Sequence, residues 1–498
     1  MEIELKLALA PRHAARIRRH PLLATIKPVR RKLHSIYFDT PTFDLMQRGI
    51  ALRLRRVGFH WVQTLKAEAR AVGAMSSRPE WEMAVAGGAS PDFAVLPQEA
   101  LALLAGIKLK RIAPVFITEF HRTTWQIERG EDKAELALDL GGIYLGEIRA
   151  GEAQQAISEV EIELKCGAPA FLFDLATQLL AQTPLTIEPR SKAERGYLLS
   201  GAISPAPVKA ARPAVSPQQS ASETWNAVMQ AALVQLVANV PGFLEQAHNI
   251  EYLHQIRIAL RRLRAGVTLA KPLGLGVPDW DAALRETMRG LNAARDWDVF
   301  LHETLPFSLT MLADTHPEDA LLKLVRDEAT HTRQQAQVLL HAPAFTQLVL
   351  DIGRSLLTPL TFENMPGANL WSAQILEKRW QALRKRCQNF AKLDPAERHM
   401  ARIAAKKMRY AADAFAPLYG KRSARFIDAL AKLQNGLGRS NDAYVGMQLL
   451  RALAKKSTPL RFDLGRLDGA LEAEVARHAH LSGAIWQRLA RTRMFWRT

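Results

Sequence analysis

The hydrophobic periodicity of this 498-residue chain changes at a proline-rich segment, and this change restricts the fold more than any other feature of the sequence. Before residue 201, short runs alternate polar and apolar residues with the period of two that is typical of β-strands. After residue 220, long segments rich in Ala, Leu, Arg and Gln follow the 3.6-residue period of α-helices. Residues 201–220 hold four prolines among Ala and Ser, which predicts an extended linker. We therefore expect an α+β chain with a β domain at 1–200, a linker at 201–220 and an all-helical domain at 221–498.

Charge restricts the class of partner. The net charge is +18, and a strongly basic soluble protein commonly meets a polyanion such as nucleic acid, an anionic membrane or a phosphate polymer. The two cysteines lie far apart, which suits a reducing compartment and excludes a disulfide framework or a Cys-based zinc site. Acidic residues precede the first apolar run, and no window approaches 18 uninterrupted apolar residues. These features predict a cytoplasmic protein without a membrane partner.

Charged residues alternate with apolar ones along the N-terminal strands. Residues 2–7 (EIELKL) place Glu2, Glu4 and Lys6 on one strand face, and the pattern recurs at 159–165 (EVEIELK). It recurs with opposite charge at 52–55 (LRLR). A sheet with a solvated charged face fits each strand alone. Taken together, the strands favour a barrel whose apolar faces lie under helices and whose charged faces point inward.

Such a polar lumen is costly to desolvate unless a ligand and a metal compensate its charges. Carboxylates and phosphate oxygens are ligands for hard divalent cations, whereas Arg and Lys neutralise phosphate oxygens directly. The residue types therefore favour a polyphosphate substrate.

Six motifs occur in order along this half: ExExK from Glu2, YFDT at 37–40, LRLR at 52–55, TLK at 64–66, EVEIEL at 159–164 and SKAERGY at 191–197. In this order they resemble the signatures of the CYTH, or triphosphate tunnel metalloenzyme, superfamily. The resemblance implies an eight-stranded antiparallel β tunnel that hydrolyses triphosphate substrates with Mg²⁺ or Mn²⁺.

The same resemblance implies roles for individual residues. It implies that Glu2, Glu4 and Lys6 are catalytic. The implied metal ligands are Glu2, Glu4, Glu161 and Glu163. The implied substrate-binding cations are Lys6, Arg53, Arg55, Lys66, Arg78, Arg122, Lys192 and Arg195.

A basic motif occurs twice in the helical half. The first copy comprises His254, Arg257, Arg261, Arg262 and Arg264, and the second, 145 residues later, comprises His399, Arg402, Lys406, Lys407 and Arg409. A second pair of segments, 291–296 (LNAARD) and 437–442 (LGRSND), follows in the same order. The repetition predicts a duplication into two pseudo-symmetric helical bundles.

Helical geometry places the histidine and three of the cations of each copy on one stripe about 15 Å long. A charge run is commonly a solvated helix face. The first stripe, however, has no acidic residue four positions away, and its spacing is repeated, which favours a surface that binds an extended anion. These motifs resemble the CHAD domain, and the resemblance implies that all ten of the repeated residues bind inorganic polyphosphate. Lysine lacks the bidentate fork of arginine, so we expect the second copy to bind less tightly.

The favoured function is an inorganic triphosphatase that cleaves tripolyphosphate to pyrophosphate and phosphate, with a C-terminal domain that binds long-chain polyphosphate and could bring the protein to polyphosphate granules. Three alternatives stay open: hydrolysis of a nucleoside or thiamine triphosphate (or cyclisation of ATP), a non-catalytic polyphosphate scaffold, and a nucleic-acid-binding protein. No aromatic-interleaved basic strand or recognition-helix pattern supports the last, so no specific nucleic-acid partner is expected.

Overall fold

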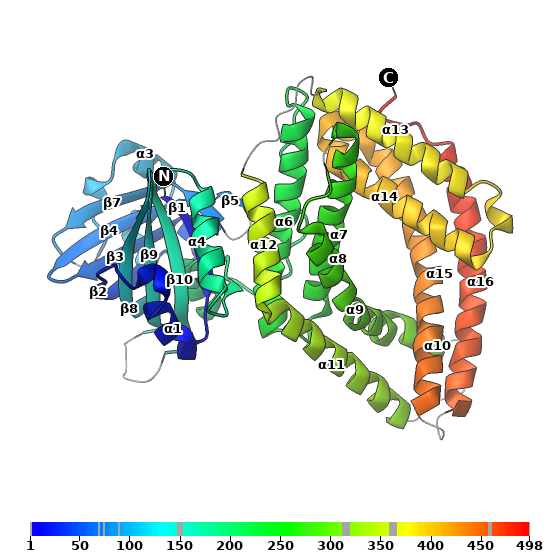
Figure 1. The fold of residues 1–498 in the computed structure, drawn as a ribbon, viewed down its shortest axis with the longest axis horizontal. Helices are drawn as coiled ribbons and strands as arrows, with labels where there is room; N and C mark the ends of the chain where they lie inside the picture. The colour runs from blue at the N-terminus through cyan, green and yellow to red at the C-terminus, as the bar shows by residue number, and fades with distance from the viewer. Residues whose placement is uncertain are drawn as a thin grey trace. The chain divides into compact units, whose positions relative to one another are not determined.

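The computed structural model divides the chain into two compact units (Figure 1). The first unit combines residues 1–208, 236–245 and 341–358, and the second combines residues 209–235, 246–340 and 359–498. The structure describes residues 2–67, 70–72, 75–87, 90–146, 153–274, 276–310, 319–357, 366–456 and 461–497.

The first unit is built on a curled antiparallel sheet (Figure 1). Within the described residues, eight of its strands have six or more residues: β1 (Glu2–Ala8), β2 (Val29–Asp39), β3 (Ala51–Val57), β4 (His60–Lys66), β7 (Glu80–Val85), β8 (Ala113–Arg129), β9 (Asp132–Tyr144) and β10 (Gln155–Cys166). Three shorter strands are β5 (Arg70–Val72), β6 (Met75–Arg78) and β11 (Thr186–Ile187). The order is β5-β6-β1-β10-β9-β8-β2-β3-β4-β7, and β11 pairs with β1.

Strands β6 and β7 lie near opposite ends of this order but follow each other in the sequence, and Pro79 joins them. β6 pairs with β1 and β7 pairs with β4, yet Pro79 alone separates β6 from β7. Proline has no N–H to donate to a ladder, which explains the interruption, and its carbonyl still accepts from Ala67 N at 3.1 Å. One segment thus joins both ends of the sheet and curls it around an interior.

Strand alternation divides the side chains between the two faces of the sheet as predicted. Leu5, Leu52 and Ile162 face outward and are fully buried. Helix α4 (Ala170–Leu180) covers β1, β9 and β10 (Figure 1), and α2 (Asp44–Gln47) and α3 (Gln98–Leu103) cover the side of β2 and β3. The charged alternates therefore face inward. Together with the helical second unit, this sheet confirms the predicted α+β fold class.

Helix α5 (Lys192–Leu199) packs on the inner face of the sheet, against β8 and β9. The Ser191 side chain caps it by accepting from Glu194 N at 3.1 Å. Gly196 lets the helix approach the ring of Phe116, which is stacked on Tyr37 with centroids 4.6 Å apart. This close packing brings Lys192, at the start of α5, to the charged interior.

Helix α12 (Pro343–Ser355) comes from the helical half of the sequence but belongs to the first unit, where it packs on α4 (Figure 1). Its Gly353 lies against the ring of Phe173, and Thr346 Oγ1 donates to the Leu185 carbonyl at 2.8 Å. Arg354 adds an ion pair with Asp174 at 2.7 Å.

The second unit is helical. Its described helices are most of α6 (Ala221–Glu245), α7 (Ile250–Ala270), α8 (Asp281–Gly290), α9 (Asn292–Val299), α10 (Leu305–Thr310), α11 (Asp319–His341), α13 (Ala368–Arg386), α14 (Pro395–Tyr419), α15 (Ala424–Lys456) and α16 (Arg461–Ala490). The repeated basic motifs lie on α7 and α14, which pack together. A capping box of Asp394 and Glu397 begins α14, and α15 runs beside α16 (Figure 1).

Helix α6 is long and apolar enough to cross a membrane by length and composition, with a mean hydropathy of 1.5 over its most apolar window. However, 61% of that window is buried within the protein, and the helix also buries Gln235 and Asn239, both hydrogen-bonded. These contacts are those of a core helix.

We expect Gly196→Ala to destabilise the first unit. A Cβ at this position would lie 2.1 Å from the Phe116 ring, which is held by Tyr37 and cannot yield freely. Overpacking of this kind costs about 1–3 kcal/mol and outweighs the helix propensity that alanine adds. Differential scanning calorimetry of the full chain should show a lower melting temperature. Gly87→Ala, whose Cβ would meet nothing within 4 Å, is the control, and an equal response of the two variants would contradict this packing.

Candidate functional site

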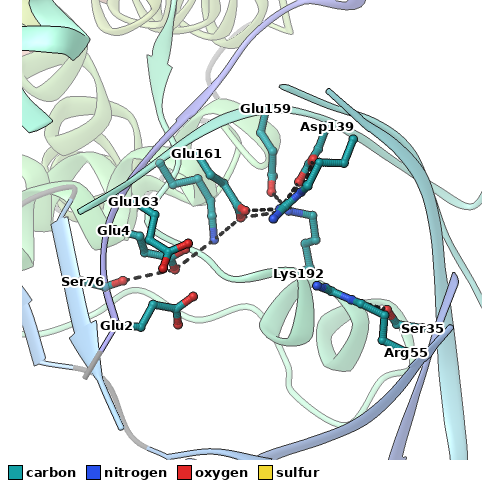
Figure 2. Close-up of polar contacts among 12 residues, drawn as sticks. Glu2, Glu4, Ser35, Arg55, Ser76, Asp139, Glu159, Glu161, Glu163 and Lys192 are labelled. Atoms are coloured by element: carbon teal, nitrogen blue, oxygen red, sulfur yellow. Dashed lines mark hydrogen bonds and ion pairs between the residues drawn. The ribbon is translucent and has the colours of Figure 1, made fainter. Parts of the chain in front are cut away.

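The curled sheet encloses a cavity of about 420 Å³ (Figure 2). Charged side chains from β1, β3, β4, β6, β7, β8 and β10 and from α5 line it. Of the residues that the sequence implicated in this half, these line it: Glu2, Glu4, Lys6, Arg53, Arg55, Lys66, Arg78, Arg122, Glu161, Glu163 and Lys192. Arg195 lies behind the lining and ion-pairs with Glu159.

Strand register brings residues that are distant in sequence onto one wall. On β1 and β10, Glu4 lies opposite Glu163, and Lys6 lies opposite Glu161. Cross-strand neighbours on one face are about 5 Å apart, so the two ExE patterns form one group of carboxylates. Figure 2 shows Glu2, Glu4 and Glu163 together on this side of the cavity.

Cations hold the carboxylates of β1 in place. Lys66 Nζ lies 2.7 Å from Glu2 Oε2, and Arg78 Nη2 donates to Glu4 Oε1 at 3.0 Å. Lys6 lies between two carboxylates, 3.7 Å from Glu4 and 3.3 Å from Glu161. Burial alone would lower the pKa of Lys6, but Glu4 and Glu161 more than reverse this and raise it.

A second, deeper carboxylate group joins Glu161, which was assigned from the sequence, with Asp139 and Glu159, which were not. Asp139, Glu159 and Glu161 place carboxylate oxygens within 4.8 Å of one another, and the first two are fully buried. Lys192 Nζ lies 2.7 Å from Asp139 and 2.9 Å from Glu161 and also pairs with Glu159, while Arg122 Nε donates to Asp139 at 2.8 Å.

The cations lower the pKa of Asp139 and of Glu161 and so keep both carboxyls ionised. Burial raises the pKa of Glu161, but Lys192, Lys6 and Arg122 hold it well below its usual range. The pKa of Lys192 is raised in turn, because the three carboxylates outweigh the effect of its burial. Alternation along β9 and β10 gave the only sequence signal for Asp139 and Glu159, since both occupy inward positions.

The opposite wall carries arginines, of which Arg53 lies 3.7 Å from Glu80 and 3.6 Å from Glu82. Arg53 and Arg55 project from β3, and Arg55 Nε donates to Ser35 Oγ at 3.1 Å (Figure 2). Among the described residues, Arg55 has no carboxylate in ion-pair contact. Burial, reinforced by the charges of Arg53 and Arg122, lowers its pKa to about 9. An anion in the cavity would relieve this repulsion.

The donor set fits a hard divalent cation. Glu2, Glu4, Glu161 and Glu163 offer carboxylate oxygens to the cavity, and no sulfur or imidazole ligand lines it. The deeper Asp139 and Glu159 are fully buried and do not line the cavity. Carboxylates at the cavity surface are therefore better placed for a metal than the deep pair.

In the second unit, the two repeated motifs meet where α7 packs on α14. Arg257, Arg261, Arg402 and Lys406 form what we call the cation cluster. Burial lowers the pKa of Lys406 to about 7, and the charges of Arg402 and Arg261 contribute to this shift. Burial and Arg261 likewise lower the pKa of Arg257 to about 10.

Two aspartates that were not assigned from the sequence face this cluster. Asp296 interacts with Arg257, and Asp442 with Arg402 and Lys406. Burial raises the pKa of both carboxyls. They occupy matching places in the 291–296 and 437–442 segments, which is consistent with the predicted duplication.

The remaining implicated cations have other partners. Arg262 Nη1 donates to Gln235 Oε1 at 2.9 Å, Arg264 lies 3.2 Å from Asp281, and Arg409 pairs with Asp413 at 2.8 Å. Lys407 and His399 are exposed. Burial, with Arg295, lowers the pKa of His254 to about 4, so this side chain is neutral near pH 7. The helical period predicted the stripe of cations, but contacts with neighbouring helices determine which of these cations lie together in the cation cluster.

We expect Lys192→Met to destabilise the first unit and to create a response to divalent metal. Removing one partner of a buried ion pair costs about 3–5 kcal/mol, and here it leaves three carboxylates repelling one another. Mn²⁺ should then raise the melting temperature of the variant more than that of the wild type. Lys133→Met, which breaks an exposed pair with Glu128, is the control and should change little. A variant as stable as wild type and no more responsive to Mn²⁺ would contradict the charge balance described here.

Comparison with known proteins identifies both halves. An inorganic triphosphatase from Haemophilus influenzae is 34% identical over 199 residues, which are 40% of this chain and 54% of that protein. The chain thus spans about half the length of this relative. The crystal structure of the CHAD domain from the plant Ricinus communis matches with 31% identity and a TM-score of 0.51, and the match covers 58% of this chain and 98% of that domain. Family models match residues 1–197 as a CYTH domain and residues 227–451 as a CHAD domain. The chain therefore combines an N-terminal CYTH domain with a C-terminal domain of the CHAD family.

Proposed function

We propose that this protein is a metal-dependent inorganic triphosphatase that hydrolyses tripolyphosphate to pyrophosphate and orthophosphate, and that its helical half binds long-chain polyphosphate. The CYTH match and the triphosphatase name of the Haemophilus influenzae relative support the reaction class. The observation that carries the proposal is the arrangement of the tunnel, where a carboxylate wall faces an arginine wall across one cavity (Figure 2).

Arg55 is the strongest indication of an anionic substrate. A buried charge without a partner is costly, and the pKa of this guanidinium is lowered to about 9 by burial and by its cationic neighbours. Phosphate oxygens would supply the missing negative charge, and the planar fork of arginine suits bidentate contact with them. Because Ser35 already orients the side chain, little reorganisation accompanies binding.

The other residues divide the work between substrate and metal. Arg53, Arg55 and Arg122 would neutralise the phosphoryl oxygens, and Lys6, between Glu4 and Glu161, would link the phosphate site to the carboxylate wall. Glu2, Glu4, Glu161 and Glu163 would hold Mg²⁺ or Mn²⁺. When bound, such an ion polarises the phosphoryl group and lowers the pKa of a water ligand.

We expect Arg55→Ala to lower the turnover of tripolyphosphate by roughly 100-fold or more, as loss of one preorganised donor does in other enzymes. Arg56→Ala is the matched control, because Arg56 is the next residue of β3, is exposed and donates from Nε to the Gly58 carbonyl at 3.0 Å. Phosphate release with Mg²⁺ or Mn²⁺ measures both variants.

Parallel assays with ATP, thiamine triphosphate and long-chain polyphosphate decide the substrate, and EDTA tests the need for metal. Indifference to Arg55→Ala would refute the assignment of the arginine wall. A higher kcat/KM for ATP or thiamine triphosphate than for tripolyphosphate would show that the preferred substrate is that triphosphate instead.

The cation cluster supports the second part of the proposal. Four cations from two packed helices repel one another, and burial keeps water from screening them. A flexible phosphate chain would compensate several of these charges at once. Counterion release then makes binding weaken steeply with added salt, as it does for other polyanions.

We expect the affinity for long-chain polyphosphate to fall as the pH rises through 7. In the protein without bound polyphosphate, the pKa of Lys406 is about 7, so this side chain is charged below that pH and neutral above it. A bound polyanion favours the charged form of the side chain. One linked proton changes the affinity by at most about tenfold per pH unit. Binding to the full chain at pH 6, 7 and 8 and fixed ionic strength measures the effect. Lys406→Arg keeps its charge and should flatten the difference, and an unchanged pH profile in that variant would exclude Lys406 as its source.

A further inference from the structure

The second copy of the basic motif borders a cavity of about 490 Å³ within the second unit, formed by α14, α15 and α16. Arg402, a member of the cation cluster, is one of its lining residues. Its Nε is buried and has no hydrogen-bond partner among the described residues. The cavity therefore adjoins the place where phosphate is proposed to bind, and one of its lining residues carries a buried donor without a partner.

Arg398 and His399 also line the cavity, and Arg398 donates to the Leu393 carbonyl at 2.7 Å. The rest of the lining is apolar or uncharged. Leu437 and Val475 contribute apolar surface, and Met400 and Tyr444 are 40% and 48% exposed. Ser440 and Asn441 add a hydroxyl and an amide. Inorganic polyphosphate has no apolar part that could use such surface, so the cavity fits a ligand with both an apolar body and an anionic tail.

Comparison with the first copy shows that this character is specific to the second. The residues that correspond to Met400, Asn441 and Tyr444 are Gln255, Arg295 and Asp298. Gln255 is buried and bonded to Gln235, and Asp298 is fully buried and lies 2.6 Å from Arg333. The first copy thus carries polar and charged side chains engaged with their neighbours where the second exposes an aromatic ring and a thioether.

We propose that this cavity binds the base of a nucleoside polyphosphate whose phosphates extend to the cation cluster. Its volume suits a small organic ligand, and Tyr444 and Met400 offer an aromatic face and a polarisable thioether to a base. The Asn441 amide can both donate to and accept from a base edge. The half-exposed ring of Tyr444 suits stacking on a planar base, which an acyl chain cannot provide, and this favours the nucleotide.

The inference rests on the proposed phosphate binding by the cation cluster, and its test separates the two. The full chain is photolabelled with 8-azido-ATP in the presence of EDTA, and labelled peptides are mapped so that the tunnel and the cavity are read separately. Label is expected on the peptides that contain Met400 or Tyr444. ATP should protect these peptides at a concentration at least tenfold lower than tripolyphosphate does.

Tyr444→Ala should lower the apparent ATP affinity at the cavity by about tenfold, within the range for loss of one base–aromatic stack, and Tyr444→Phe should restore it. Binding of long-chain polyphosphate should stay unchanged in both variants. Phe59→Ala, which removes a 92% exposed ring in the first unit, is the control for loss of an aromatic surface.

Equal protection by ATP and tripolyphosphate, or label on tunnel peptides alone, would overturn the base pocket. Stronger protection by dihexanoyl phosphatidic acid than by ATP would overturn it in favour of a lipid. Failure of the wild type to bind long-chain polyphosphate would overturn the proposed role of the cation cluster instead.

Discussion

Mutual neutralisation of buried charges inside the curled sheet is the interaction on which the first unit depends. Asp139 and Glu159 are fully buried, and carboxylates in that position are tolerable only because cations contact them directly. Those cations, Lys192 and Arg195, come from α5, so the helix must sit at one depth within the sheet. Gly196 makes that depth possible. Packing and electrostatics are therefore a single constraint here.

The helical unit has the opposite electrostatic condition. Asp296 and Asp442 compensate its cations only in part, and burial lowers the pKa of Lys406 to about 7 and that of Arg257 to about 10. The tunnel is close to neutral before substrate arrives, except at Arg55, whereas the cation cluster is left strained until an anion binds. A polyanion that binds only the folded state would accordingly stabilise it.

Local pattern predicted much of this, and long-range pairing determined the rest. Alternation with a period of two assigned Leu5 to the outer face and Glu4 to the inner face correctly, because a strand imposes that period on every residue. The same alternation places Asp139 and Glu159 on the inner face. How deeply they are buried depends on the strand register and on the position of α5, and neither can be read from a single segment of the sequence. On the helices the 3.6 period found the stripe. It could not show that Arg264 would turn to Asp281, since that partner lies on another helix.

The packing of α12 on α4 has a consequence for synthesis on the ribosome. The strands and α5 emerge well before residue 343, yet the first unit includes α12, whose Gly353 lies against Phe173. At roughly 5–20 residues per second, translation from α5 to α12 takes on the order of ten seconds. During that interval the outer side of α4 lacks its native cover. The CYTH half is therefore incomplete until a helix encoded within the CHAD half has been synthesised, and until then apolar surface on α4 is available to a chaperone.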